Sequence, residues 1–152
     1  MPDKKKVSLS EKNSRILMIE MNKIIERIAD EKTKYIISGK IQTSLAYPPN
    51  NGFNTKESAF IQKLITNDED GLNALRKILA DSIACGVFDL FNLIDGTADP
   101  ELDSWEKDGI SLIDKDGSIE DNNEMLHDSL FEKYWDWQEM RNEDWKLDTI
   151  EE

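Results

Sequence analysis

The sequence has few residues that bind metals or form disulfides, and it has no long apolar run. Cys85 is the only cysteine and His127 the only histidine among 152 residues. One cysteine excludes a disulfide within the chain, and one cysteine with one histidine is too few for a structural zinc site, so no cofactor is expected. No apolar run approaches the ~20 residues of a membrane-spanning helix, and no apolar segment follows the lysines at 4–6 to form a signal peptide. The sequence therefore predicts a cytoplasmic protein.

Apolar residues are also scarcer than in an average globular protein. They make up 38% of the chain, and charged residues make up 34%. The apolar residues nevertheless occur in blocks, which a disordered chain lacks. A chain of this length usually forms one domain. We therefore expect a single folded domain over 1–152, with flexible ends at 1–7 and 147–152.

Positive charge is deficient, and the deficit is confined to one half of the chain. Residues 1–76 contain 13 Lys/Arg and 10 Asp/Glu, whereas residues 77–152 contain 6 and 22, and the net charge of the chain is −13. A negative field repels nucleic-acid phosphates and anionic membrane surfaces. We therefore expect neither nucleic acid nor membrane as a partner, but a basic protein. Acidity that only keeps the protein soluble explains the charge equally well.

Apolar residues in the first part of the chain recur at helical spacing. A capping box at residues 8–11, Ser-Leu-Ser-Glu, predicts the start of a first helix near Ser8, and apolar residues follow every three or four positions over 17–29. Residues 33–46 are interpreted as a second helix, with a strand as the alternative because their β-branched residues also suit a strand. The sequence Pro-Pro-Asn-Asn-Gly at 48–52 breaks regular structure.

Two further helices follow this break. Thr55 is the expected N-cap of a helix over 55–66. The helix predicted over 72–94 is apolar on nearly all sides, so we expect it at the centre of the protein. Gly86 within it predicts the close approach of another helix, and Gly96 ends it in a left-handed conformation.

The pattern of apolar and polar residues changes in the last third of the chain. Alternation of apolar and polar residues on both sides of an Asp-Gly turn at 116–117 predicts a small β-hairpin near 110–119. A last helix is predicted over 122–142. The expected fold class is mainly α: a compact bundle in which the first helix, the 55–66 helix and the last helix surround a central 72–94 helix, with the small hairpin packed on them.

The acidic last third also carries the strongest functional signal. From Asp99 onward the chain contains 19 Asp/Glu, 5 Lys/Arg and all four tryptophans. Tryptophan is frequent at binding hot spots, and surrounding carboxylates speed the encounter with a basic partner. We expect Trp105 and Trp137 in the core, whereas Trp135 falls at the edge of the apolar face of its helix. The predicted partner-binding residues are Trp135, Asp128, Glu132, Asp136, Glu139 and Glu143.

Three residues on the 72–94 helix invite a chemical interpretation. Asp81, Cys85 and Asp89 follow one another at four-residue spacing and share one ridge. Asp89 has apolar neighbours, so its carboxylate needs a cation, hydrogen-bond donors or water. A buried ion pair with a Lys or Arg of the first helix is the preferred interpretation, and a metal or ligand site is the alternative. Catalysis by Cys85 and His127 is disfavoured, because Cys85 lies away from the helix N-terminus that would activate a thiol.

The second half of the chain resembles small bacterial proteins, some of them immunity proteins of toxin systems. The motifs that carry the resemblance are Phe-Asn-Leu-Ile-Asp-Gly at 91–96, Asp-Pro at 99–100, Met-Leu-His-Asp at 125–128, and Tyr134. The resemblance implies a cytoplasmic, mostly helical binder that blocks a toxin and has no chemistry of its own. It assigns no catalytic residue.

The leading hypothesis is therefore a non-catalytic acidic binding protein that occupies a basic protein partner, with a toxin as one candidate. A second hypothesis is a metal-dependent hydrolase or other enzyme that uses Asp81, Asp89 and His127. A third is an oligomeric scaffold that makes its contacts through the wide apolar face of the first helix. The sequence leaves the oligomeric state open.

Overall fold

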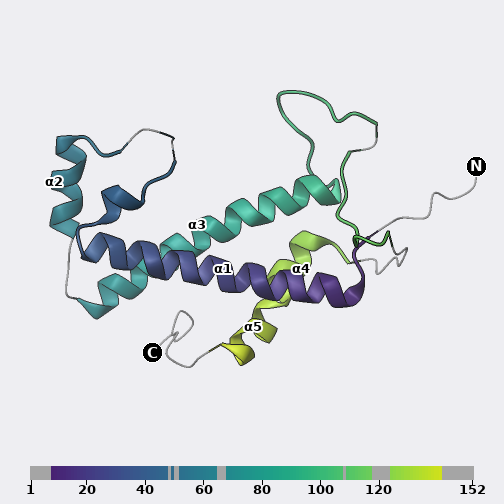
Figure 1. The fold of residues 1–152 in the computed structure, drawn as a ribbon, viewed down its shortest axis with the longest axis horizontal. Coiled ribbons are helices and arrows are strands. Elements are labelled where there is room, and N and C mark those ends of the chain that lie inside the picture. Colours follow the sequence, from purple (N-terminus) through teal and green to yellow (C-terminus); the bar gives the residue numbers. More distant parts are fainter. Residues whose placement is uncertain are drawn as a thin grey trace, which may run out of the picture. The chain divides into compact units, whose positions relative to one another are not determined.

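The structure, a computed structural model, describes residues 8–47, 49, 52–64, 68–107, 109–117 and 124–141. These residues are mainly helical, as predicted, and contain no strand. The helices in Figure 1 are α1 (Glu11–Ile37), the short 3₁₀ helix η1 (Ile41–Ser44), α2 (Thr55–Leu64), α3 (Glu69–Asp95), α4 (Leu126–Glu132) and α5 (Tyr134–Met140). None of these described helices is long and apolar enough to cross a bilayer.

The chain divides into two compact units, and the long helices α1 and α3 contribute to both. The first unit comprises Met1–Ile24 and Ala84–Asn142, and the second comprises Ile25–Ile83 and Glu143–Glu152. The first therefore contains α4 and α5, and the second contains η1 and α2. One domain over 1–152 stays a prediction, and the predicted flexible ends at 1–7 and 147–152 lie outside the described residues.

The start of α1 is stabilised by Ser10, not by Ser8. The Ser10 hydroxyl accepts a hydrogen bond from the N–H of Asn13 at 3.3 Å. The N–H of Ser10 donates to Oδ1 of Asp114 at 3.2 Å, across 104 residues of sequence. A local capping box would instead supply a carboxylate from the helix itself. The predicted start near Ser8 is therefore wrong by a few residues, because a distant carboxylate completes the cap.

The end of α1 shows that the segment over 33–46 begins as a helix. α1 continues to Ile37, so the strand alternative is wrong for this part. Gly39 then adopts φ +71°, and its N–H donates to the carbonyl of Ile36 at 3.1 Å. This is the C-terminal cap that glycine favours, because a left-handed residue can end a helix without steric cost. The chain re-forms a helical turn only in η1.

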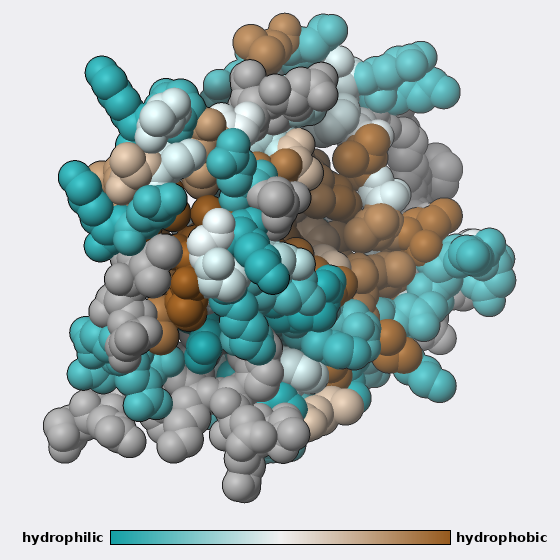
Figure 2. All heavy atoms as spheres, turned by 60° about the vertical axis from the view of Figure 1, so that its left-hand side comes forward, coloured by the Kyte–Doolittle hydropathy of each residue, from teal (hydrophilic) through white to brown (hydrophobic). Residues whose placement is uncertain are grey.

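The most deeply buried helix is α1, and the prediction of a central 72–94 helix is wrong. The buried apolar residues of α1 are Met18, Ile19, Ile25 and Ala29. In α3 only Phe91 is buried, whereas Ile78 is 62% and Leu90 is 51% exposed. Figure 2 shows apolar side chains at the surface of the protein among polar ones. An apolar helix is buried on all sides only if other elements cover every side, and its own sequence does not determine how many do so.

Two glycines of the α3 region are expected to respond oppositely to alanine. Gly86 is exposed, and an added Cβ would meet nothing within 4 Å, so the predicted close helix approach is wrong. Gly86→Ala should raise the free energy of unfolding by about 0.5–1 kcal/mol, because alanine loses less backbone entropy in a helix. Gly96 has φ +72°, which is the left-handed conformation that was predicted. Gly96→Ala should therefore lower the free energy of unfolding by about 1–2 kcal/mol. Urea unfolding followed by circular dichroism measures both changes, and equal signs would contradict this assignment.

The predicted hairpin near 110–119 is wrong over the residues that the structure describes. Residues 109–117 contain no strand, and 118–119 lie outside the described residues. The turn itself is present, because the N–H of Gly117 donates to the carbonyl of Asp114 at 3.0 Å. The Asp114 side chain binds the N–H of Ser10 in addition. Alternation predicts which side chains share a face, but a hairpin also needs strand pairing, and residues 109–117 form no strand.

The last predicted helix, over 122–142, is divided into α4 and α5. The two helices meet at Lys133, which has φ −79° and ψ 0°. Nδ2 of the buried Asn22 donates to the carbonyl of Leu130 at 2.8 Å. In a continuous α-helix this carbonyl would accept from the N–H of residue 134. The break therefore coincides with a hydrogen bond that ties the last helical region to α1.

Candidate functional site

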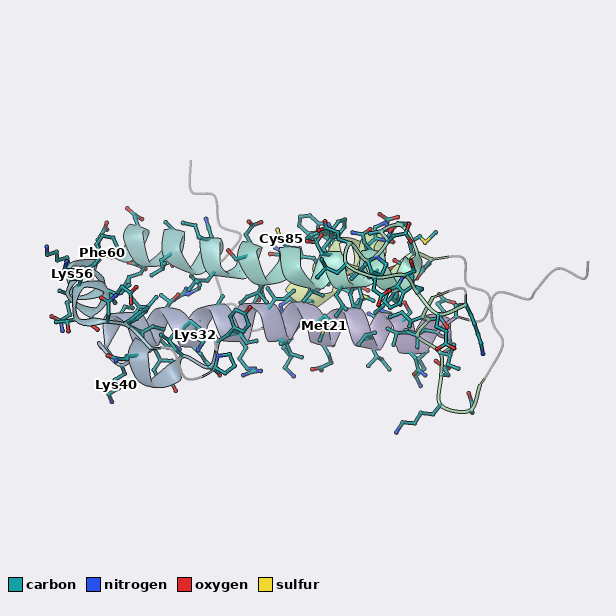
Figure 3. The ribbon with its side chains drawn as sticks, turned by 90° about the horizontal axis from the view of Figure 1, so that it is seen from above. Met21, Lys32, Lys40, Lys56, Phe60 and Cys85 are labelled. Carbon is teal, nitrogen blue, oxygen red and sulfur yellow. The ribbon has the colours of Figure 1, made fainter. Side chains whose placement is uncertain are left out.

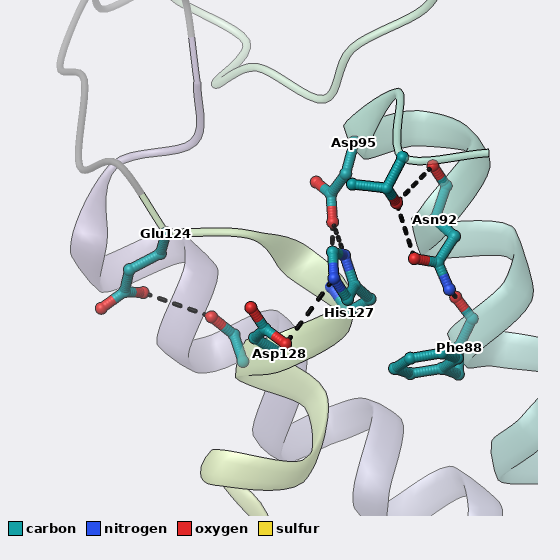
Figure 4. Close-up of polar contacts among 8 residues, drawn as sticks. Phe88, Asn92, Asp95, Glu124, His127 and Asp128 are labelled. Carbon is teal, nitrogen blue, oxygen red and sulfur yellow. Dashed lines mark hydrogen bonds and ion pairs between the residues drawn. The ribbon is translucent and has the colours of Figure 1, made fainter.

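An enclosed contact between two ionisable side chains of the first unit joins Asp95, the last residue of α3, to His127 at the start of α4. Oδ2 of Asp95 accepts a hydrogen bond from the N–H of His127 at 3.0 Å and lies 2.6 Å from its Nδ1 (Figure 4). The side chains of Asp95 and His127 are only 7% and 13% exposed. Because an ionised carboxylate can only accept, Nδ1 carries the proton of this bond. The carboxylate also satisfies an N–H group of the first turn of α4 that lacks a partner within that helix.

The rest of the His127 ring is surrounded by aromatic and acidic groups. The ring packs edge-on against Phe88, with centroids 5.4 Å apart, and Phe88 in turn contacts Phe131 at 5.5 Å. Nε2 lies 3.6 Å from Oδ1 of Asp128, whose side chain is 76% exposed. A histidine held by a carboxylate can act as a general base if a reacting group lies within reach of its other nitrogen. Here Nε2 lies beside the carboxylate of Asp128, and Nδ1 is bound to Asp95. The bond to Asp95 connects the end of α3 to the start of α4.

The sequence indicated His127 as a candidate catalytic residue and did not identify Asp95 as its partner. One signal could have done so. Asp95 is the last residue of a long helix, where the macrodipole disfavours negative charge. A carboxylate at such a position needs a compensating partner, and His127 provides it.

The other proposed catalytic residues lie elsewhere on α3 and are exposed. Asp89 makes no ion pair with any described residue, so the predicted buried pair with the first helix is wrong. Its carboxylate reaches water instead, which removes the need for a cation. Asp81 is also exposed, and so is Cys85, which is labelled in Figure 3. The described residues include no group of three or more His, Cys, Asp or Glu that could hold a metal ion.

The predicted partner-binding residues on α4 and α5 form an exposed surface with one addition. We define the acidic aromatic face as Asp128, Phe131, Glu132, Trp135 and Glu139. Their spacings of three and four residues place them on one side of the helical region, and the right-handed α-helical backbone of Lys133 carries that spacing across the break. Trp135 is 63% exposed, and Phe131, which was not predicted as a binding residue, is 51% exposed.

Two predicted residues do not belong to this face. Asp136 is turned toward α1, because its Oδ2 lies 3.0 Å from Nε of Arg15. Its side chain is correspondingly only 34% exposed. Glu143 lies outside the described residues. Trp105 and Trp137, expected in the core, are half-buried.

Negative charge is concentrated in the unit that carries the face. The described residues of the first unit contain 15 Asp/Glu and 7 Lys/Arg, whereas those of the second contain 8 of each. The nearest cations are already engaged: Lys133 lies 3.6 Å from Glu132, and Arg141 lies 5.9 Å from the centroid of the Tyr134 ring. Glu139 makes no ion pair with the described part of the chain. The carboxylate of Glu139 is therefore available to a partner.

These features define a mainly helical protein with an enclosed His–Asp contact and an exposed acidic aromatic surface. The chain matches no protein-family model, no curated protein and no solved structure.

Proposed function

We propose that this protein is a non-catalytic cytoplasmic binding protein that occupies a basic protein partner with its acidic aromatic face. An immunity protein that neutralises a toxin is the form of this function that we favour. The observation that supports it most is the exposure of Trp135 and Phe131 between carboxylates. Large aromatic side chains lose much apolar surface to water when a partner covers them, and they dominate binding energies in many interfaces.

The charge around these aromatic residues suits a basic partner. Asp128 and Glu132 have side chains that are 76% and 66% exposed. Exposed carboxylates at the rim of an interface mainly raise the association rate of a cationic partner, and they do so most at low salt. The aromatic residues would then slow dissociation. Together they fit a protein that must capture its partner quickly and retain it.

The two other functions have less support. For a hydrolase, His127 would have to direct a free nitrogen at a metal or substrate, but Nδ1 is bound to Asp95 and Nε2 faces Asp128. For a scaffold, the apolar face of α1 would have to be available, but Met18 and Ala29 have no exposed surface. An exposed aromatic surface with exposed carboxylates favours the binding protein.

The test is the recovery of partners from an extract of the native cell at increasing salt. We expect to recover a basic protein in an equimolar amount to this protein, and we expect it to elute as the salt concentration rises. Trp135→Ala should weaken its binding about 30-fold, and the double substitution Glu132→Lys with Glu139→Lys should slow its association about tenfold. Surface plasmon resonance with the recovered protein measures both effects.

The matched control is the double substitution Glu101→Lys with Glu106→Lys. It changes the net charge equally, at exposed acids of the same unit that lie outside the face. It should leave the dissociation rate unchanged and affect association less than the face variant does. Recovery of only neutral or acidic proteins, or equal weakening by the two double variants, would contradict the proposal.

A further inference from the structure

The second unit contains a groove that the proposed function does not use. The groove has a volume of about 760 Å³, and the residues that line it belong to α2 and to the described positions 45, 47 and 52–54 before it. Its apolar wall is formed by Leu45, Tyr47, Phe53, Phe60 and Ile61. Tyr47 is 87% and Phe60 is 59% exposed. Two large aromatic side chains therefore border the groove with most of their surface in water, which is typical of a binding surface.

Polar contacts within the second unit hold the wall of this groove in place. Oδ1 of Asn54 accepts hydrogen bonds from the N–H groups of Lys56 and Glu57, both at 2.9 Å, and Oε2 of Glu57 accepts from the N–H of Asn54 at 2.8 Å. This capping box, with Asn54 in place of the predicted Thr55, fixes the start of α2. Nε2 of Gln42 donates to the carbonyl of Phe53 at 3.4 Å. The side of the groove formed by Phe53 and the start of α2 is therefore held in place without a ligand.

The groove is lined by one lysine, Lys56, and by one acidic residue, Glu57, whose carboxylate is used in the capping box. Lys63 follows Lys56 on the same helix, α2. Lys56 lines the groove and lies with Phe60 on α2, as Figure 3 shows. Neither Lys56 nor Lys63 makes an ion pair with the described residues. An occupant with negative charge and a bulky apolar group would match both properties of the groove.

We propose that this groove binds an acidic peptide segment of another protein, with a bulky apolar side chain inserted between Tyr47 and Phe60 and carboxylates directed at Lys56. The apolar wall provides the area that a large side chain needs, and the charge of Lys56 selects against basic sequences. Nucleic acid fits less well, because the chain carries a net charge of −13 and the wall includes the aliphatic residues Leu45 and Ile61. The inference does not depend on the acidic aromatic face.

The experiment uses the full chain and a fluorescein-labelled synthetic peptide of about ten residues that contains glutamates, one tryptophan and two leucines. Fluorescence anisotropy at low salt should show saturable binding. We expect Phe60→Ala, and separately Lys56→Glu with Lys63→Glu, to weaken the peptide about tenfold or more. Two altered peptides, one with lysine for glutamate and one with alanine for tryptophan, should bind at least about tenfold more weakly.

Two control variants keep the test specific. Trp135 lies on the acidic aromatic face, so Trp135→Ala should leave peptide binding unchanged. Lys12→Glu with Lys77→Glu matches the charge change at exposed lysines that do not line the groove, and it should weaken binding less than the groove variant. Circular dichroism confirms that each variant is folded.

Several results would overturn the proposal. One is the absence of saturable binding, and another is an equal loss in the groove and control variants. A third is tighter binding of a single-stranded oligothymidylate at the same groove, which would indicate a nucleic-acid site. A fourth is a dimer in sedimentation equilibrium that Phe60→Ala dissociates, because the occupant would then be a second copy of the chain.

Discussion

Replacing Asp95 by alanine is expected to lower the free energy of unfolding by about 3 kcal/mol. The Asp95 side chain is 7% exposed, and its carboxylate holds both the N–H and the ring of His127. Without it, the two groups of His127 lose their acceptor in a site that water reaches poorly. The end of α3 and the start of α4 would also lose the contact that joins them. Urea unfolding followed by circular dichroism measures the loss.

Two other substitutions make this result specific. Asp89→Ala removes a carboxylate from the same helix, but Asp89 is exposed and makes no ion pair with described residues, so the change should stay within about 0.5 kcal/mol. Asp95→Asn keeps the size and one acceptor oxygen, so its effect should lie between those of Asp95→Ala and Asp89→Ala. An equal loss in Asp89→Ala and Asp95→Ala would contradict the importance of the His127 contact.

Replacing Asn22 by alanine is expected to lower the free energy of unfolding by about 2–3 kcal/mol. Nδ2 of this residue, which is only 6% exposed, donates to the carbonyls of Met18 at 2.9 Å and Leu130 at 2.8 Å. Alanine removes the donor to a carbonyl on a fully buried residue, Leu130, and leaves a cavity beside it. Chemical unfolding at equilibrium measures this loss.

The contributions of side-chain volume and of hydrogen bonding at Asn22 to stability can be measured separately. Asn22→Leu fills the space but donates no hydrogen bond, so we expect it to remain less stable than the wild type by at least about 1 kcal/mol. Asn13→Ala, at an exposed position of the same helix, should change stability by no more than about 0.5 kcal/mol. Wild-type stability in Asn22→Leu would show that Asn22 contributes only its volume.

Local sequence predicted most helices of this protein but placed their ends imperfectly. The first helix was recognised from apolar spacing, the helix at 55–66 from a capping residue at its start, and Gly96 as a helix end. The caps were misplaced, because several polar residues near each start can serve. Asn54 caps α2 where Thr55 was predicted, and Asp114 completes the cap of α1 from another part of the chain.

Helical spacing also predicted part of the acidic aromatic face. Helical spacing placed Trp135 at the edge of an apolar face beside carboxylates, and Trp135 is exposed there. Spacing could not show that Arg15 turns Asp136 toward α1, because these residues are 121 apart in the sequence. It also could not show that Phe131 would remain half exposed, since that depends on which elements cover α4.

By itself, then, the amino-acid order determined which segments are helical, which side of each is apolar, and how unevenly charge is distributed. These properties depend on residues a few positions apart, whose interactions the helix geometry fixes in advance. Only the tertiary structure decided that α1 and not α3 is the most buried helix, that Asp95 pairs with His127, and that apolar side chains border a groove beside α2. Burial and ion pairing depend on groups brought together from distant positions, and their free energy depends on the surrounding packing, which no local pattern specifies.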